Sequence, residues 1–305
     1  MRVLIVASGN SSKVSPFVKE QADSLMKLDC TIDYFLIEGR GIFGYLKNYF
    51  LLKRILKRSK RYDLIHAHYG LSGLLASLQP SIPVVITFHG SDVNLNMRNY
   101  LLSLFASRLA NANIFVHTNL SKSLKYYPNQ ANIIPCGVDL DLFRPISKTV
   151  ARDKLGLDNK ETYVLFSSSF DNKIKNASLA KLAVKRVENT ILIELKNFSR
   201  REVSLLLNAV DLLLVTSYSE TGPLIVKEAL ACNCPLISTD IGDVKTLIAE
   251  TKNCFITKYD AEDIASKIDV ILKSDRMSNG RDKVKHLGLD IIGNRVLNIY
   301  RRMLV

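Results

Sequence analysis

Short apolar runs alternate with longer amphipathic stretches along almost the whole of this chain. Buried strands of a parallel sheet are short and apolar, and the helices that connect them are longer. The strands expected in the first half are Val3–Ala7, Thr31–Ile37, Leu64–Ala67, Val84–Thr87, Asn113–His117 and Asn132–Ile134. The expected helices are Pro16–Leu28, Tyr45–Lys60, Gly70–Leu78 and Tyr100–Ala110. This pattern predicts βαβ units and an α/β fold.

The alternation pauses at a turn-rich connection between Pro135 and Pro145 and then restarts. The later expected strands are Tyr163–Ser167, Thr190–Leu195, Leu212–Thr216, Leu236–Ser238 and Cys254–Ile256, and the later expected helices are Leu179–Val187, Arg200–Asn208, Ile225–Ala231, Ala261–Lys273 and Ile291–Leu304. A length of 305 residues suits two such domains. We therefore predict two doubly wound domains, 1–145 and 146–286, with a closing helix, 287–305, that packs back on the first.

Cysteine usage and the apolar runs indicate a cytoplasmic setting. The five cysteines are odd in number and scattered, which argues against a disulfide framework. The N-terminal apolar run, Val3–Ala7, is too short for a signal peptide. No run approaches the roughly 20 apolar residues that a membrane-spanning helix needs.

The formal net charge of +13 predicts a phosphate-bearing partner, without choosing among nucleic acid, an anionic membrane and a nucleotide diphosphate. Much of this charge lies in the stretch Arg40–Arg61, which has eight Lys or Arg residues and no acid. Its apolar residues recur at helical spacing, so we expect a surface helix packed on the sheet. The same stretch suits attachment to anionic lipid as a peripheral membrane protein. No nucleic-acid recognition motif accompanies the charge.

The segment Ser217–Leu230 is the strongest functional signal, because it follows a buried strand and opens a helix. Gly222 is expected to allow a tight turn, and the proline after it suits a first helical position. The free N–H groups of Leu224 and Ile225 then form an anion site at the helix start.

Two glutamates flank that helix start. Glu220 lies in the loop before the helix and Glu228 lies about one and a half turns into it, so both can reach one ligand from different sides. The alternative is that Glu220 caps the helix while Glu228 pairs with Lys227 or solvent. Spacing alone leaves both interpretations open.

The Glu-x7-Glu pattern and the residues after it resemble the C-terminal signature of the GT4-type retaining glycosyltransferases, which have the GT-B fold. Further motifs fall in the order that family shows: His66-Ala67-His68, His89-Gly90-Ser91-Asp92, Gly137-Val138-Asp139 and Lys175-Asn176. The resemblance covers most of the chain. It implies two Rossmann-like domains facing a central cleft.

The resemblance also implies roles for single residues. Glu220 would contact the hydroxyls of the transferred sugar, and Glu228 those of the nucleotide ribose. The helix start at Leu224 and Ile225 would take the diphosphate. His89 would contact the donor sugar or orient the acceptor, whereas Ser91 and Asp92 have a simple role as helix caps.

Lys175 resembles the family lysine that neutralises the departing diphosphate. This loop departs from the family pattern, since many relatives carry Arg at the position of Ser169 and Gly at that of Asn176. Lys173 is expected to supply the missing charge. In the first domain, the backbone of Gly9 is expected to approach the donor phosphates.

No metal or other cofactor is expected. His66 and His68 share one face of a strand, but no third ligand sits at metal spacing. The family works without a bound divalent ion.

These observations predict a retaining glycosyltransferase that moves a sugar from a UDP- or GDP-sugar to a glycan or lipid-linked acceptor, in bacterial surface polysaccharide assembly. One alternative is a nucleotide-sugar epimerase or hydrolase on the same fold. The other is a catalytically weak subunit that binds a nucleotide sugar or a partner enzyme.

Overall fold

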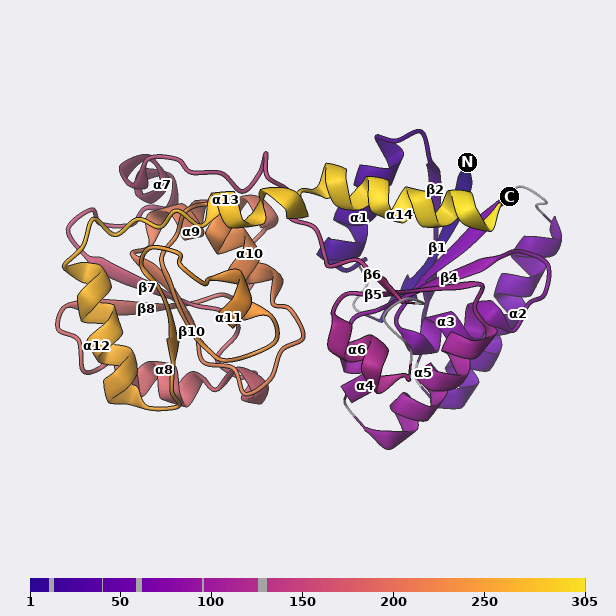
Figure 1. The fold of residues 1–305 in the computed structure, drawn as a ribbon, viewed down its shortest axis with the longest axis horizontal. Coiled ribbons are helices and arrows are strands. Elements are labelled where there is room, and N and C mark those ends of the chain that lie inside the picture. Colours follow the sequence, from indigo (N-terminus) through magenta and orange to yellow (C-terminus); the bar gives the residue numbers. More distant parts are fainter. Residues whose placement is uncertain (11–13, 40, 59–61, 95, 126–130, 305) are drawn as a thin grey trace. The chain divides into compact units, whose positions relative to one another are not determined.

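The computed structural model describes residues 1–10, 14–39, 41–58, 62–94, 96–125 and 131–304. Contacts divide the chain into a first unit, Met1–Gly137 with Leu289–Val305, and a second unit, Val138–Gly288. Within each unit, helices cover a parallel sheet (Figure 1).

The sheet of the first unit has the strand order β2-β1-β3-β4-β5-β6, counted over the described residues, and every neighbouring pair is parallel. Its strands are β1 (Arg2–Ser8), β2 (Thr31–Ile37), β3 (Leu64–His68), β4 (Val84–Phe88), β5 (Ala112–Phe115) and β6 (Asn132–Ile133). All five residues of β3 and of β4 are buried. These strands are therefore apolar along their whole length, except where a histidine or threonine has a buried partner.

The helices of the first unit lie on both faces of that sheet (Figure 1). They are α1 (Pro16–Met26), α2 (Gly41–Arg58), α3 (Gly70–Ser77), α4 (Ser91–Asn94), α5 (Met97–Leu109), α6 (Thr118–Ser123) and the closing helix α14 (Leu289–Met303). Helix α14 packs on α1, and Gly293 permits the close approach: a Cβ there would lie 2.8 Å from Ser24 Oγ.

The sheet of the second unit has the order β11-β10-β9-β7-β8, again with parallel neighbours. Its strands are β7 (Thr162–Phe166), β8 (Thr190–Glu194), β9 (Leu212–Val215), β10 (Leu236–Thr239) and β11 (Cys254–Thr257). Its helices are α7 (Lys148–Leu155), η1 (Lys173–Lys175), α8 (Ala177–Val184), α9 (Arg200–Ala209), α10 (Leu224–Ala231), α11 (Val244–Leu247), α12 (Ala261–Leu272), α13 (Arg281–Val284) and η2 (Lys285–Leu287). The prediction of two parallel-sheet α/β domains is confirmed.

The second unit begins at residue 138 rather than 146, because its own side chains hold the connecting segment. Arg281 donates hydrogen bonds to the carbonyls of Leu140 (2.8 Å) and Phe143 (2.7 Å). Ser204 Oγ donates to the carbonyl of Leu142 at 2.7 Å. Residues 138–145 of the turn-rich connection thus belong to the second unit.

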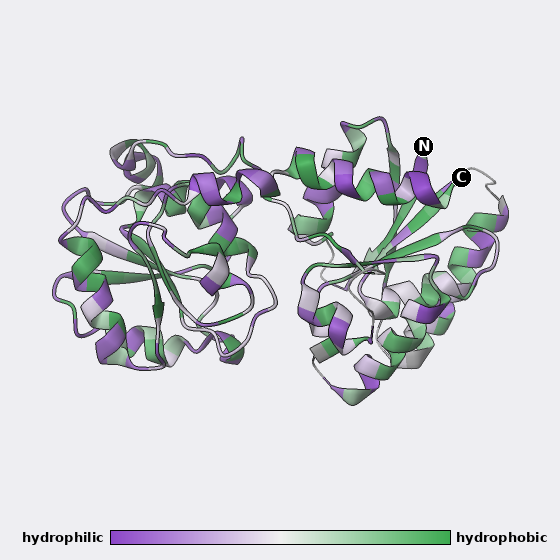
Figure 2. Cartoon of the chain, in the orientation of Figure 1, coloured by the Kyte–Doolittle hydropathy of each residue, from purple (hydrophilic) through white to green (hydrophobic). Residues whose placement is uncertain are grey.

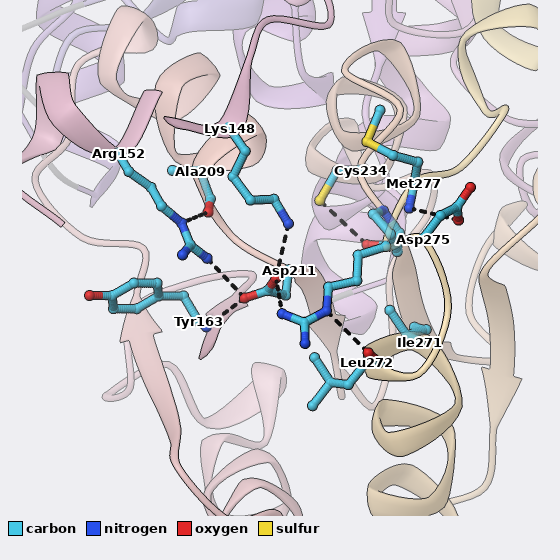
Figure 3. A network of polar contacts seen from close by, with 12 residues as sticks. Lys148, Arg152, Tyr163, Ala209, Asp211, Cys234, Ile271, Leu272, Asp275 and Met277 are labelled. Atoms are coloured by element: carbon cyan, nitrogen blue, oxygen red, sulfur yellow. Dashed lines mark hydrogen bonds and ion pairs between the residues drawn. The ribbon is translucent and has the colours of Figure 1, made fainter. Parts of the chain in front are cut away.

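Asp211 anchors the end of this sheet where β9 begins (Figure 3). Its carboxylate lies 2.9 Å from Lys148 Nζ and 3.0 Å from both Arg152 and Arg276, and it accepts from the N–H of Tyr163 at 2.9 Å. Three cations and a backbone donor thus surround one buried carboxylate, which ties α7, β7 and β9 together. Asp211 therefore lies at the end of the sheet opposite the carboxyl ends of the strands, where ligands of such folds bind.

Candidate functional site

The loops that follow β7 and β9 are joined at the carboxyl end of the second sheet, where ligands of such folds bind. The N–H of Tyr218 donates to the carbonyl of Ile174 at 2.9 Å. Thr216 Oγ1 lies 2.9 Å from the carbonyls of both Lys175 and Asn176. These bonds hold the two loops in register, so that a side chain of one loop has a fixed position relative to the other.

Lys175 and Glu220 form an ion pair across these loops. Each side chain is 19% exposed, so the pair is accessible from solvent yet mostly shielded. Ser217 Oγ donates to the same Glu220 oxygen at 3.2 Å. The structure therefore brings together a cation and a carboxylate that the sequence places 45 residues apart.

Tyr259 holds the loop after β9 from the other side, and sequence analysis missed it. Its hydroxyl donates to the carbonyl of Ser217 at 3.0 Å, and its ring stacks on that of Tyr218 with centroids 5.7 Å apart. Both rings are largely exposed. An aromatic residue just after the last strand of the sheet is the signal that could have drawn attention to it.

Helix α10 begins beside this loop. Pro223 is its N-cap, one residue earlier than the helical position expected for it. Within the described chain, the N–H groups of Leu224 and Ile225 have no hydrogen-bond acceptor, as expected for the first turn of a helix. They are available to an anion.

The tight backbone approach at this helix start involves Gly242 rather than Gly222. Gly242 has a φ of 53°, and a Cβ there would lie 2.6 Å from the carbonyl oxygen of Thr221. A Cβ at Gly222 would lie at an ordinary 3.4 Å from both carboxylate oxygens of Asp243. Gly222 therefore needs no special conformation, whereas Gly242, in the loop after β10, has a backbone conformation and a close contact that favour glycine.

Glu228 is 1% exposed and forms an ion pair with Arg200, a partner that the spacing alone did not suggest. Arg200 Nη2 lies 2.5 Å from Glu228 Oε1, and the guanidinium carbon lies 4.7 Å from the ring centroid of Phe143. Lys227 is equally buried, with its Nζ 4.0 Å from Asp243. Sequence analysis missed Arg200, because its pairing with Glu228 depends on the packing of α9 against α10.

The loop after β7 uses Ser169 as a structural hydrogen-bonding residue. Ser169 Oγ bonds to Asp171 and lies 3.0 Å from Glu194. Asp171 also pairs with Lys196 at 3.0 Å. Lys173 is exposed, and no described residue forms an ion pair with it. Its charge is therefore not neutralised by a neighbouring acid in the described chain.

In the first unit, the rings of His66, His68 and His89 form a row, in which His66 and His68 are buried and His89 is partly exposed. The rings of His66 and His68 stack at 4.5 Å, which confirms that they share one face of β3. His66 lies 2.5 Å from the Tyr300 hydroxyl and 2.7 Å from Thr87 Oγ1, and His68 Nδ1 lies 3.0 Å from His89 Nε2.

Burial keeps these histidines neutral. It lowers the pKa of His68 to about 3 and the pKa values of His66 and His89 well below the ordinary 6.5. Among the described residues, no group of three or more His, Cys, Asp or Glu is placed to hold a metal ion. The imidazole of His89 is therefore a neutral hydrogen-bonding group.

The His89 backbone is fixed by Asp92. That carboxylate accepts from the N–H groups of His89 (3.2 Å), Gly90 (2.7 Å) and Gly70, the first residue of α3 (3.1 Å). Asp92 lies within α4, so it is not the simple N-cap that was expected; its carboxylate instead accepts the first N–H of α3. Tyr69, the residue before α3, has a φ of 72°, which is rare for a residue with a side chain. The centroid of its ring lies 4.7 Å from that of the His89 ring.

Gly9 has a structural explanation. Its N–H donates to the carbonyl of Ile37 at 2.8 Å, and a Cβ there would lie 2.8 Å from Leu36 Cβ. The N–H of Gly9 is therefore already hydrogen-bonded to the residue that ends β2. The rest of the loop, residues 11–13, lies outside the described residues.

The structure thus brings Lys175, Glu220 and the start of α10 together in the second unit. Glu228 and Lys173 belong to the same unit, whereas His89 and Gly9 belong to the first.

Comparison with known families gives two matches that together cover most of the chain. Residues 17–142 match Glycosyltransferase Family 4, and residues 188–285 match Glycosyl transferases group 1. The chain is 26% identical over 249 residues to a putative teichuronic acid biosynthesis glycosyltransferase, TuaC of Bacillus subtilis. That match covers 72% of this chain and 63% of the relative, so the chain spans less than two thirds of its length.

Two solved structures share the fold over nearly the whole chain. A sucrose-phosphate synthase from Thermosynechococcus elongatus has a TM-score of 0.85 at 19% identity and covers 99% of this chain and 98% of its own. HepE from Anabaena, in complex with UDP and glucose, has a TM-score of 0.80 at 13% identity and covers 99% and 100%. At these identities the likeness concerns the fold.

Proposed function

The chain belongs to the GT4-type glycosyltransferases with the GT-B fold, and from this premise we propose that it transfers a sugar from a nucleotide-diphosphate sugar to a glycan or lipid-linked acceptor. The transfer retains the configuration at the anomeric carbon. The natural setting is bacterial surface polysaccharide assembly on the cytoplasmic side of the membrane.

The observation that carries the proposal is the ion pair between Lys175 and Glu220. Transfer from a nucleotide sugar requires a carboxylate that accepts hydrogen bonds from the sugar hydroxyls, and a cation where the diphosphate leaves. Both groups lie at the carboxyl end of the sheet, and the helix start at Leu224 adds unpaired N–H donors. In the absence of donor, the two charges neutralise each other.

Binding of the donor separates the pair in this account. Glu220 turns to the hydroxyls of the transferred sugar, while Lys175 takes the diphosphate together with the N–H groups of Leu224 and Ile225. Glu228 accepts hydrogen bonds from the ribose. We propose UDP or GDP as the nucleotide, and the fold similarity to HepE solved with UDP and glucose supports the first.

In the bond exchange, the acceptor oxygen attacks the anomeric carbon on the face from which the diphosphate departs. The carbon–oxygen bond to the diphosphate breaks, and the leaving phosphate oxygen takes the acceptor proton. No side chain is assigned as general base. Lys175 stabilises the charge that develops on the leaving group, which removes the need for a divalent ion.

The acceptor is proposed to bind the first unit, where His89 is held as a neutral imidazole beside Phe17 and Tyr69. A neutral imidazole donates one hydrogen bond and accepts another, as a hydroxyl acceptor requires. We also propose that the basic stretch Arg40–Arg61 brings the enzyme to an anionic membrane. Its end residues, Arg40 and Arg61, lie outside the described residues.

Thermal unfolding in the presence of UDP-, GDP- and ADP-sugars tests the proposal. A bound donor raises the unfolding temperature by mass action, and we expect a shift with one UDP- or GDP-sugar. The same sugar is then incubated with protein alone and with acceptor. Release of free or epimerised sugar without acceptor indicates the hydrolase or epimerase instead. No shift with any donor contradicts the enzyme interpretation.

One observation favours the catalytically weak subunit as second candidate. Ser169 stands where many relatives carry arginine, and its hydroxyl is committed to Asp171 and Glu194. Such a subunit binds the donor with a thermal shift but gives no product with any acceptor extract.

A further inference from the structure

Helix α2 exposes a set of apolar side chains that its packing does not use. Its inward side is buried by Leu52 and by partly buried residues such as Tyr45 and Tyr49. On the outward side, Phe43 is 83% exposed and Phe50 61%, with Leu46 and Leu51 also exposed. An ordinary surface helix has polar residues at such positions.

Helix α5 exposes a second apolar stripe. Met97 is 70% exposed, and Leu101, Phe105 and Leu109 follow at four-residue spacing with more than two fifths of each side chain exposed. Residues four apart lie on one side of a helix. The inward side holds small residues, Ser103, Ala106 and Ser107, which let α5 pack closely on the rest of the unit.

The two stripes belong to one layer of helices. Helix α3 contacts both α2 and α5, and all three cover the same face of the sheet, opposite α1 and α14 (Figure 1). Figure 2 shows hydrophobic residues along both outer helices. Helix α3 itself is mostly buried between them. We call the outward sides of α2 and α5 the two-helix face.

The exposed charged side chains of the two-helix face are all positive. They are Lys47, Lys53, Arg54 and Lys57 on α2 and Arg98 and Arg108 on α5. Glu38 and Asp63 are the nearest acids in the sequence on either side of α2, and no Asp or Glu occurs between Asp92 and Asp139. Exposed aromatic and aliphatic residues set among cations are the composition of surfaces that lie in an anionic lipid interface.

We propose that the two-helix face docks on an anionic lipid bilayer, with Phe43 and Phe50 of α2 and Met97 and Phe105 of α5 entering the interfacial region while the cations contact lipid headgroups. This deepens the proposed membrane contact of Arg40–Arg61: it adds α5, which lies outside that stretch, and makes apolar insertion part of the binding. Among the described residues, no helix is long and apolar enough to cross a bilayer.

Flotation with lipid vesicles tests the proposal. Wild-type chain is compared on phosphatidylcholine vesicles with and without phosphatidylglycerol, at low and high salt. The variants are Phe43→Ser with Phe50→Ser, Met97→Ser with Phe105→Ser, and the control Leu182→Ser with Val270→Ser. The control residues are 54% and 53% exposed on helices of the second unit.

We expect binding only to the anionic vesicles, weakened by salt. Each pair of substitutions in the two-helix face should weaken binding at least roughly tenfold, since each removes two large apolar groups from the interface. The control pair should bind as wild type does. If the α2 substitutions weaken vesicle binding and the α5 substitutions do not, the two-helix face is overturned. If all variants bind vesicles as wild type does, neither apolar stripe contributes to binding.

Two further readouts separate the possible failures. Size-exclusion chromatography of wild type and variants shows whether the face pairs with a second copy of the chain. A dimer that both pairs of substitutions dissociate overturns lipid docking. The thermal shift with donor sugar should persist in both variants of the two-helix face, because their substitutions lie outside the second unit. Vesicle binding without any donor shift contradicts the proposed function while leaving the two-helix face intact.

Discussion

The guanidinium of Arg200 lies 2.5 Å from the carboxylate of Glu228, a side chain almost wholly removed from solvent. A buried carboxylate that loses a cationic partner is strongly disfavoured. Replacing Arg200 with Ala should therefore lower the free energy of unfolding by about 2 kcal/mol, less than for a fully buried pair, because the Arg200 side chain is partly exposed. Denaturant titration measures this loss.

The same substitution should raise the KM for the donor nucleotide, since Glu228 is proposed to hold the ribose. Arg201, exposed and next in the sequence, is the matched control: Arg201→Ala should change stability by less than about 0.5 kcal/mol and leave KM unchanged. Equal effects of the two substitutions would show that the charge of this segment, not the pair, is what matters.

Lys173 is proposed to supply charge that the family usually places at the position of Ser169. Because Lys173 is exposed, its attraction for a diphosphate is screened by salt. Lys173→Ala should raise the donor KM by roughly threefold to tenfold at low salt and by less at high salt. Initial rates at two ionic strengths measure this. An unchanged KM at low salt removes Lys173 from the donor site, and Lys185→Ala is the control for an exposed lysine.

Asp211 predicts a defined acid sensitivity (Figure 3). Burial alone would raise its pKa, but the Tyr163 N–H and the cations Lys148 and Arg276 outweigh burial and hold it below the ordinary 3.8. A carboxyl with a lowered folded pKa stabilises the fold above its ordinary pKa and loses that contribution as pH falls through the folded value. Asp211→Asn should therefore cost about 3 kcal/mol at pH 7 and progressively less below about pH 4. A cost that does not vary with pH would rule out ionisation as its origin.

The buried histidines predict a second pH dependence at higher pH. A histidine with a lowered folded pKa takes up its proton first in the unfolded chain, so stability falls as pH drops below the ordinary pKa of 6.5. His68→Gln removes one such group. Between about pH 6 and pH 4 the pH slope of the unfolding free energy should decrease by about 1.4 kcal/mol per pH unit. An unchanged slope would mean that His68 is protonated in the folded chain.

Much of the fold follows from the spacing of apolar residues. The segment Thr31–Ile37 forms β2 with the expected bounds, because β-branched and aromatic residues fill a strand between two turn signals. Helix α7, Lys148–Leu155, was not predicted. It is short and polar, and it depends on Asp211, more than 50 residues away, which pairs with Lys148 and Arg152. Such a helix is stabilised by tertiary contacts that a local pattern does not contain.

In the candidate site, too, features of local sequence were predicted and long-range contacts were not. The order of strand, loop and helix placed Glu220 before α10, because a loop between a buried strand and a proline at a helix start is readable locally. The ion-pair partner of Glu228 could not be predicted from the sequence. Arg200 comes from α9, and the chain distance of 28 residues to Glu228 is closed only by packing of α9 against α10. Likewise, the tight backbone approach expected at Gly222 involves Gly242, because the loop after β10 comes close to the backbone of Thr221.

If Lys175 and Glu220 act as one unit on the donor, the initial rates of transfer by Lys175→Ala, Glu220→Ala and the double variant should show it. With the donor found by thermal shift, each single substitution should reduce kcat at least roughly 100-fold. The double variant should be little worse than either, because groups that act together are not additive. Lys185→Ala, on the exposed C-terminal end of α8, should leave kcat unchanged. Transfer by Lys175→Ala and Glu220→Ala within about threefold of wild type would contradict the account.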